Sequence, residues 1–375
     1  TLDGETGSGA VILLGGRLYA SDDVQANIDH VTATLYQTLL NNGYSADNIY
    51  YLSTATNAAG VDGASTLANL QFAITTWAKS RVSESRSLTL YLIDHGDKGI
   101  FYVDETQGQR LTPAQLDEWL DRLEEAVPNV AINVLIEACY SGSFITGASG
   151  VGPLSKAGRV IMTSTNLHNL AFASEQGAYF SDYLFTALRQ GHHLFSGFWE
   201  ARIAPRQVTQ LIQDPWLDAD GDGAPNELED AAIAARRTLF APNSQATSQL
   251  WPPYIATLQE AASVNGQRQI QADVRDNSAI ARVWAVIYPP GYQPPTSGNE
   301  LTPDNAPKAD LVLVGDRYQL NYTGFTQLGL YRVVVHAVDS DGLQARPAVI
   351  TVNTAAPVGG QFENNAMIYL PLVTR

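Results

Sequence analysis

The stretch of sequence that decides the fold is VAINVLIEACYSGS at residues 130–143. An apolar run of strand length that gives way to small residues and glycine is typical of a buried parallel strand that ends in a loop. A second run of this kind, SLTLYLIDHG, occupies residues 87–96. In open α/β sheets, chemistry collects at the carboxyl ends of the strands. The two runs therefore predict that His95 and Cys139 lie at the same edge of one sheet.

Apolar runs and amphipathic segments alternate on both sides of these two strands, which predicts a mostly parallel sheet flanked by helices. One helix is marked strongly: Thr112 is its expected N-cap, Pro113 its first residue and Gln115 the partner in a capping box. The expected strands cover residues 11–15, 48–53, 87–93, 130–136 and 159–163, and the expected helices include residues 24–42, 64–79 and 178–189.

The pattern changes after about residue 265 to runs of period two, such as residues 281–288 and 331–338. These runs predict a smaller antiparallel β-sandwich of the immunoglobulin-like kind over residues 266–353. The predicted α/β domain then covers residues 1–265, and residues 354–375 form a linker and tail. A proline-rich loop is expected at residues 289–307, inside the sandwich.

Composition limits the partners of the chain. The net charge is −16, from 38 acidic and 22 basic residues, and such a charge repels nucleic acids and anionic lipid surfaces. No apolar run approaches the roughly 20 residues that a membrane-spanning helix needs. The first residue is Thr1 rather than methionine, which we interpret as a processed amino terminus. Together with the low cysteine content, these features predict a secreted or cell-surface protein.

Cys139 is the only cysteine among 375 residues, so it cannot form a disulfide within the chain. Its neighbours favour a reactive thiol over an inert one. A cysteine nucleophile needs a nearby imidazole to take its proton and backbone N–H groups to hold an oxyanion. His95 can supply the imidazole. Gly96 has no side chain to keep a substrate carbonyl away, so its N–H and that of Cys139 are the expected oxyanion donors.

The motifs Asp94-His95-Gly96 and Glu137-Ala138-Cys139, each after an apolar strand, resemble those of the legumain (asparaginyl endopeptidase) family of caspase-like cysteine peptidases. The resemblance covers about residues 11–190. It implies that Cys139 is the nucleophile and His95 the general base and acid of an endopeptidase that acts on peptide or protein substrates and needs no cofactor for its chemistry.

The resemblance also implies a pocket for the substrate side chain before the cleaved bond, the P1 side chain. The resemblance places Glu137 and Asp182, near the start of a helix, in this pocket. Ser164, at the end of the fifth strand, and Asp23 are the other expected substrate-binding residues. The arginine that the family places before its first helix has no clear counterpart, because Asp23 stands there and Arg17 is the only nearby arginine. The P1 residue is therefore expected to be Asn, or Arg or Lys if the pocket is acidic.

Two other functions stay open from the sequence. A transpeptidase or ligase uses the same acyl-enzyme but accepts an amine in place of water. A catalytically inactive binding or adhesion protein could keep the peptidase fold as a scaffold stabilised by calcium.

Residues 218–229, DADGDGAPNELE, fit the twelve-residue calcium loop. Oxygen ligands this close repel one another unless a divalent cation lies among them, so we expect a structural Ca²⁺ there. The expected ligands are Asp218, Asp220, Asp222, the carbonyl of Ala224, Asn226 and Glu229. A helix is expected to follow over residues 227–239.

Overall fold

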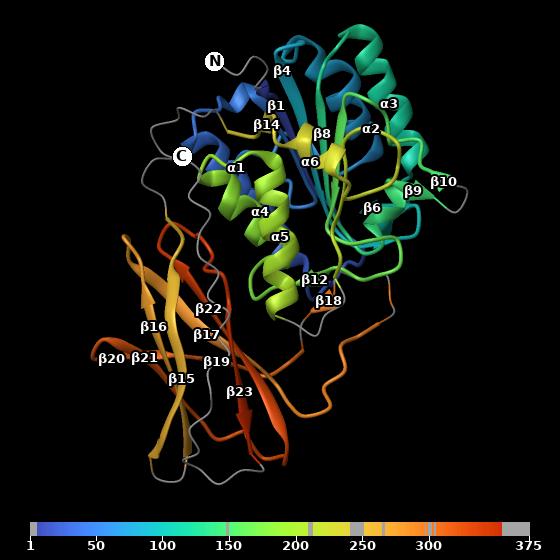
Figure 1. Ribbon diagram of the computed structural model, residues 1–375. Helices are drawn as coiled ribbons and strands as arrows, with labels where there is room; N and C mark the ends of the chain where they lie inside the picture. Colours follow the sequence, from blue (N-terminus) through green and yellow to red (C-terminus); the bar gives the residue numbers. More distant parts are fainter. Residues whose placement is uncertain are drawn as a thin grey trace.

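The protein has two parts, a helix-flanked parallel sheet and a C-terminal pair of antiparallel sheets (Figure 1). The computed structural model describes residues 6–147, 150–208, 213–240, 251–264, 267–296, 298, 302–303 and 305–354. The predicted tail at residues 354–375 lies outside the described residues except for Thr354.

An eight-stranded sheet forms the centre of the first part. Its strands β11, β8, β4, β1 and β2 are parallel neighbours in that order, β3 and β14 add in parallel, and β13 pairs antiparallel with β11 at the edge. The bounds are β1 Thr6–Gly15, β2 Ile49–Ser53, β3 Gly63–Ala64, β4 Arg86–Ile93, β8 Ile132–Glu137, β11 Arg159–Thr163, β13 Trp216–Asp218 and β14 Arg237–Thr238. The long apolar runs thus become strands that are buried on both faces.

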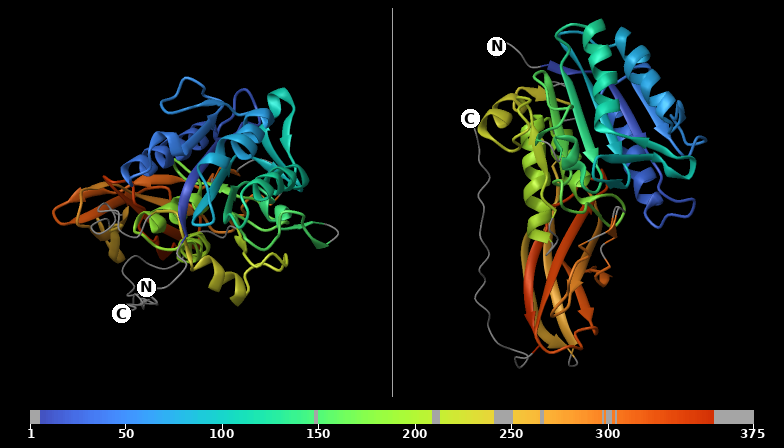
Figure 2. Two further views of the ribbon diagram at one scale, coloured as in Figure 1. Left: turned by 90° about the horizontal axis from the view of Figure 1, so that it is seen from above. Right: turned by 90° about the vertical axis from the view of Figure 1, so that its right-hand side faces the viewer.

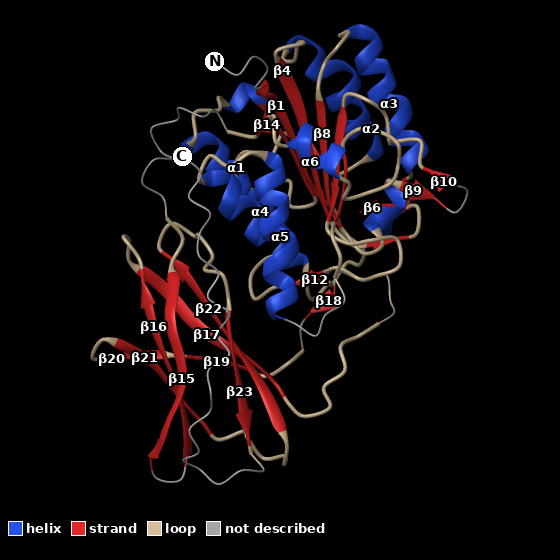
Figure 3. Ribbon diagram, viewed as in Figure 1, coloured by secondary structure: helices blue, strands red, loops and turns tan. Residues whose placement is uncertain are grey.

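Helices cover both faces of this sheet, as Figures 2 and 3 show. Successive residues of β1 point to opposite faces: Ile12 packs in one hydrophobic cluster with Leu70 and Leu116, and Leu13 packs in the other with Ile28. The first face carries α2 (Leu67–Phe72) and α3 (Pro113–Ala126), and the second carries α1 (Gln25–Asn41), α4 (Tyr179–Arg189) and α5 (Leu194–Val208).

The helix ends follow the local sequence signals. The hydroxyl of Thr112 accepts the N–H of Gln115, and the side chain of Gln115 accepts the N–H of Thr112, so the predicted capping box is confirmed. The helical segment expected at residues 64–79 begins later, at Leu67. Only Leu67–Phe72 (α2) is α-helical; a π-turn at Ala73–Trp77 and a 3-10 turn at Ala78–Ser80 follow without a break. The helix expected at residues 227–239 was too long, because α6 covers only Leu228–Ala234 and the chain then enters β14.

Two four-stranded antiparallel sheets form the C-terminal part. Their orders are β15-β16-β21-β20 and β19-β17-β22-β23. The bounds are β15 Tyr254–Val264, β16 Gln267–Arg275, β17 Ile280–Tyr288, β19 Lys308–Asp310, β20 Val312–Val314, β21 Arg317–Tyr322, β22 Leu330–Asp339 and β23 Ala348–Asn353. The structure differs from the predicted boundary at residue 265, because β15 already pairs with β16.

The two parts share a hydrophobic core. In β17, Val283 and Ile287 point into the core between the C-terminal sheets, whereas Trp284 and Tyr288 belong to the cluster that includes Phe180 of α4. Both faces of β17 are therefore buried, which fixes the C-terminal sheets against the helices α4 and α5.

The predicted fold class is confirmed: a mostly parallel, helix-flanked sheet precedes separate antiparallel sheets. Among the described residues, no helix combines the length and the apolar character required to cross a membrane.

Candidate active site

His95 and Cys139 follow directly after neighbouring strands. In the parallel pair of β4 and β8, Ile93 lies opposite Glu137. The pairing continues one residue further, because the N–H of Asp94 donates to the carbonyl of Glu137 at 3.1 Å. His95 and Cys139 are therefore neighbours at the carboxyl edge of the sheet, where the sequence places them.

Gly96 lies against the backbone of Cys139. A Cβ atom at this position would be 2.6 Å from the carbonyl oxygen of Cys139 and 3.0 Å from the Cβ of Ala138. No side chain fits there, because real Cβ atoms do not approach other atoms so closely. The glycine thus lets the end of β4 touch the turn that carries the cysteine.

The chain turns sharply after Cys139. Tyr140 has φ 55°, in the left-handed region that residues other than glycine rarely adopt. The Cys139 sulfur accepts the N–H of Ala171 at 3.3 Å, and Asn169 accepts the N–H of Tyr140 at 2.9 Å. Cys139 and His95 are each only 1% exposed. In this structure, therefore, the segment around residue 170 covers the thiol.

Asp22 is the functional residue that sequence analysis missed. Its Oδ2 lies 2.6 Å from Nε2 of His95, and both side chains are almost fully buried. Burial raises the pKa of Asp22, but the hydrogen bond and charge of His95 outweigh it, so that this pKa is lowered. A carboxylate before the first helix is a signal in the sequence, but it is shared by Asp22 and Asp23 and does not distinguish them.

Asp94 is a buried carboxyl group beside this pair. Burial, together with the negative charges of Asp22 and Asp104, raises the pKa of Asp94 well above its usual value. Neither of its side-chain oxygens has a hydrogen-bond partner. Gly16 leaves the space for this group, because a Cβ atom at Gly16 would lie 2.5 Å from Oδ2 of Asp94. The protonated form of Asp94 is therefore favoured relative to an exposed aspartate.

Glu137 lies beneath the cysteine turn and is fully buried. Its Oε2 accepts the N–H of Ser181 at 2.9 Å and the Ser181 hydroxyl at 2.8 Å, at the start of α4. Its Oε1 has no hydrogen-bond partner. Burial raises the pKa of Glu137 to about 7 despite hydrogen bonds from Ser181 and Ser164, and the charge of Asp182 adds to this rise.

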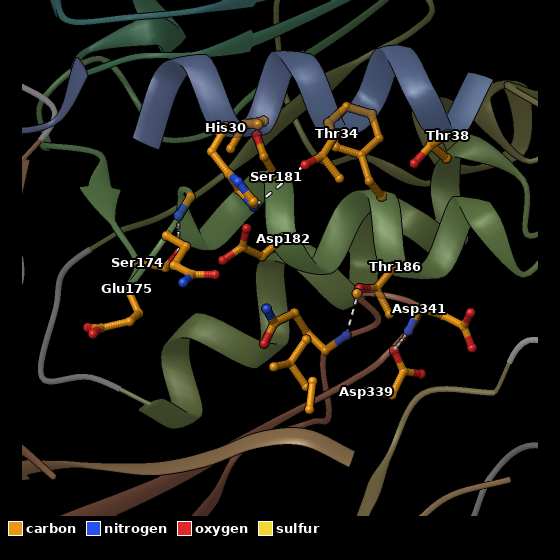
Figure 4. A pocket seen from close by; sticks show the side chains of 18 of the residues that line it. His30, Thr34, Thr38, Ser174, Glu175, Ser181, Asp182, Thr186, Asp339 and Asp341 are labelled. Carbon is orange, nitrogen blue, oxygen red and sulfur yellow. Dashed lines mark hydrogen bonds between the residues drawn. The ribbon is translucent and has the colours of Figure 1, made fainter. Parts of the chain in front are cut away.

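Asp182 faces a different space from the cysteine. It lines a cavity of about 370 Å³ between α1, α4 and the C-terminal sheets, together with His30, Ser174 and Asp339 (Figure 4). Among the described residues that line this cavity, neither Cys139 nor His95 is found. Burial raises the pKa of Asp182 to about 7, against hydrogen bonds from Ser174 and Ala178. The charge of Asp182 affects the pKa of Glu137, so the two carboxyl groups are close. Asp182 nevertheless lines the cavity, whereas Glu137 lies beneath the cysteine turn.

The other expected pocket residues lie apart. Ser164 is buried beneath the cysteine turn, where its hydroxyl accepts the N–H of Ala138 at 3.1 Å. Asp23 is exposed at the start of α1. Arg17 donates to Asp104 at 2.8 Å, so this arginine is already paired. The structure therefore groups Glu137 and Ser164 with the cysteine, and it leaves Asp23 on the surface.

Three of the expected calcium ligands converge. Asp218, Asp220 and Asp222 each place a carboxylate oxygen within 4.8 Å of the others. Asp218 is 1% exposed, and its Oδ2 is buried without a hydrogen-bond partner. Gly221 and Gly223 have φ 85° and 77°, which turns the loop around this cluster. Three converging carboxylates, of which Asp218 is buried and Asp222 is exposed, offer the oxygen ligands that a hard divalent cation prefers.

Asn226 and Glu229 are not part of this cluster. The side-chain oxygen of Asn226 accepts the N–H of Leu217 at 3.1 Å, so it faces β13. Glu229 is exposed. Its buried neighbour Asp230 accepts the N–H groups of Ala219 at 2.7 Å and Glu227 at 2.9 Å. The expected six-ligand set is therefore only partly assembled, because Asn226 and Asp230 satisfy backbone groups of the loop itself.

The fold and the site define a class of protein: a caspase-like α/β fold with a histidine and a cysteine at the ends of adjacent parallel strands. The peptidase C13 family matches residues 18–194, a range that contains both of these residues and Asp22. Residues 18–194 of the α/β part are thus similar to this family of cysteine peptidases, the legumain family. No curated protein matches the chain.

Proposed function

We propose that the protein is a cysteine endopeptidase in which Cys139 is the nucleophile and His95 transfers the proton. The supporting observation is the adjacency of the two strand ends, with Asp22 on Nε2 of His95. Because Nε2 is held by Asp22, Nδ1 is the nitrogen that would exchange a proton with Cys139. Asp22 orients the ring and stabilises the imidazolium that forms during the reaction.

The proposed reaction has two halves. The thiol of Cys139 gives its proton to His95, and the thiolate attacks the carbonyl carbon of the peptide. The N–H groups of Gly96 and Cys139 stabilise the oxyanion. The C–N bond then breaks, the leaving amine takes the proton from His95, and a thioester remains on Cys139. Water gives a proton to His95 and its hydroxyl to the thioester, which releases the acid and restores the thiol.

We further propose that the P1 residue is Asn or a basic residue, with Glu137 as the pocket carboxylate. Oε1 of Glu137 is buried and without a hydrogen-bond partner, so it can accept a donor from the substrate. An amide N–H or an ammonium group would serve, and a basic group would also offset the charge. Arg17 is paired with Asp104, which favours Arg or Lys over an acidic P1 residue.

We also propose a structural Ca²⁺ held by Asp218, Asp220 and Asp222. The ion would compensate the three carboxylates and thereby fix the loop. This loop touches the segment that follows the cysteine turn: Thr146 donates to the carbonyl of Gly223 at 2.6 Å, and Gly221 lies against the backbone of Lys156. Calcium loops of extracellular modules bind weakly and suit millimolar calcium, which supports a secreted or cell-surface location.

The test is turnover of fluorogenic peptides that carry Asn, Asp, Arg or Lys at P1. It compares the wild-type protein with Cys139→Ala and with Ser85→Ala, a surface control, in calcium and in EDTA. We expect cleavage after Asn or a basic residue that is lost in Cys139→Ala alone. Equal turnover in all three proteins would assign the cleavage to a contaminant. No turnover, with Cys139 of the folded protein also resisting iodoacetamide at neutral pH, would favour an inactive binding protein.

A further inference from the structure

A short strand beside Cys139 is paired with a strand from the C-terminal part. β12 (Phe172–Ala173) and β18 (Thr302–Pro303) form a two-stranded parallel sheet, with Phe172 opposite Thr302 and Ala173 opposite Pro303. They lie side by side below the carboxyl edge of the central sheet (Figure 1). β18 belongs to the proline-rich loop that leaves the end of β17.

Other described residues of this loop contact the same region. Pro294, Pro295 and Thr296 line a small cavity together with Leu170 and Phe172. The backbone of Gly298 donates a hydrogen bond to the hydroxyl of Tyr140, the residue after the cysteine. The loop therefore contacts both the segment that covers the thiol and the residue that follows Cys139.

The direction of β12 fixes the direction of a substrate that pairs with it. β12 starts next to the cysteine, because the N–H of Ala171 contacts the Cys139 sulfur, and it runs away from there through Phe172 and Ala173. In a substrate, the residues before the cleaved bond must run towards the sulfur and end there with the P1 carbonyl. A substrate strand on this edge is therefore antiparallel to β12.

β18 runs the opposite way. It is parallel to β12, so the chain in β18 moves away from Cys139 rather than towards it. A strand in this direction covers the edge, but its residues do not run towards the sulfur as the residues before a cleaved bond must. It can exclude a substrate and still remain uncut.

A buried glutamine side chain holds β12 in place. The side chain of Gln213, only 2% exposed, accepts the N–H of Phe172 at 3.2 Å and donates to the carbonyl of Ser164 at 2.9 Å. This amide ties β12 to the carboxyl end of β11. Consequently β12 is expected to keep its place when β18 leaves, which would present a fixed edge to a peptide.

We propose that β18 occupies the edge of β12 in the direction opposite to that of a substrate and is therefore not cleaved. An extended peptide binds antiparallel to β12 only after β18 has moved away. The C-terminal sheets then regulate access to Cys139 by displacement of a strand rather than by its cleavage. This inference rests on the proposed peptidase function, because the direction of the substrate follows from attack by Cys139.

The test locks the two strands together. In Ala173→Cys/Pro303→Cys the new thiols occupy opposite positions of the pair, where a disulfide would join the two strands. Peptide mapping verifies the 173–303 link. The rate of Cys139 alkylation by iodoacetamide and the turnover of an extended peptide are then measured for oxidised and for reduced protein. Pro303→Cys and the wild-type protein, treated with the same oxidant, are the controls.

We expect both rates to fall at least about ten-fold in the oxidised double variant and to recover on reduction, because the lock removes the open population. Oxidised-to-reduced ratios near one are expected for the controls. An oxidised double variant with the alkylation rate of its reduced form would overturn the inference, even if no peptide is cleaved. If no reduced protein cleaves the peptide but the disulfide still slows the alkylation of Cys139, the result would count against the peptidase function alone.

The uncleaved state has a separate test in the same samples. Mass spectrometry of the active protein should find the 289–307 segment intact after many turnovers. Cleavage within Thr302–Pro303 by the protein's own Cys139, absent from Cys139→Ala, would contradict the reversed direction.

Discussion

Asp22 and His95 form a buried pair 73 residues apart in the sequence, with 2.6 Å between Oδ2 and Nε2. The pair joins the loop before α1 to the end of β4, so the orientation of the imidazole depends on two elements that meet only in the folded protein. The exposure of the two side chains is 4% and 1%, and in such surroundings the interaction of opposite charges is stronger than in water.

Replacement of Asp22 by asparagine tests this pair. Asn keeps the shape but removes the charge that stabilises an imidazolium, so we expect kcat to fall about 10²-fold, within the range of general acid–base effects. Steady-state kinetics measure the effect. Asp47→Asn, on an exposed residue far from the site, is the matched control and is expected to leave kcat unchanged. A kcat for Asp22→Asn equal to that of the control would remove Asp22 from the mechanism.

Gly96→Ala tests the contact between the strand end and the cysteine turn. The added methyl group would lie 2.6 Å from the carbonyl of Cys139, so the two segments must move apart. We expect a loss of about 1 to 3 kcal/mol in the free energy of unfolding, typical of overpacking, and a loss of turnover. Gly147→Ala is the control, because its Cβ meets nothing within 4 Å. Denaturant unfolding that shows Gly96→Ala as stable as the control would mean that the contact is loose.

The sequence predicted most of what surrounds the sulfur. Long apolar runs followed by small residues located β4 and β8, and the spacing of Thr112 and Gln115 located the start of α3. These signals are local: burial on both faces and a cap leave a pattern within one segment. The edge on which His95 and Cys139 meet follows from the rule for parallel strands.

Features that depend on distant contacts could not be predicted in this way. Asp22 differs from Asp23 only in which of them reaches His95, and a sequence pattern cannot distinguish them. β12 and β18 each contain two residues, too few to show a period. Asp182 was expected at the P1 pocket, but it lines the cavity between α1, α4 and the C-terminal sheets, which segments far apart in the sequence form together.

The raised pKa of Glu137 predicts a pH dependence of stability. Its folded-state pKa of about 7 is above the model-peptide value of 4.5, so the folded protein holds a proton that the unfolded chain loses. The contribution is therefore fully present below pH 4.5 and is lost as the pH rises to about 7. In Glu137→Gln we expect the decline of Tm between pH 5 and pH 8 to become shallower. Thermal unfolding at fixed calcium measures it, with Glu118→Gln on the surface as the control; parallel curves for the three proteins would contradict the assignment.

Arg159 predicts a strong dependence of folding on one buried cation. Its side chain is fully buried, and its guanidinium donates to Asp117 at 2.7 Å, Asp121 at 2.7 Å and Glu124 at 2.9 Å. Arg159→Met removes the guanidinium from all three carboxylates and leaves Lys156 paired with Asp117 and Asp121, so we expect a loss of about 3 kcal/mol in the free energy of unfolding, the lower end of the range for a broken buried pair. Arg122→Met, which breaks an exposed pair with Glu118, should change it by less than about 1 kcal/mol. Urea unfolding of both variants decides, and equal losses would show that the buried cluster adds nothing specific.

We expect removal of calcium to destabilise the protein. Substitutions of Glu229 and Asp230 should distinguish the contribution of the ion from that of the loop's own hydrogen bonds. If the loop binds Ca²⁺ with the free ion at about 100 times Kd, mass action stabilises the folded protein by about 2.7 kcal/mol, and EDTA removes this contribution. Exposed Glu229 is free to turn towards the ion, whereas buried Asp230 holds the N–H groups of Ala219 and Glu227.

We therefore expect Glu229→Gln to reduce only the difference in Tm between calcium and EDTA. Asp230→Asn should lower Tm in both conditions, because it removes acceptors that the loop needs with or without an ion. Thermal unfolding in calcium and in EDTA, together with calorimetric titration of Ca²⁺, measures these effects. A wild-type Tm that EDTA leaves unchanged, with no heat of Ca²⁺ binding, would show that Asp218, Asp220 and Asp222 form a solvated acidic turn.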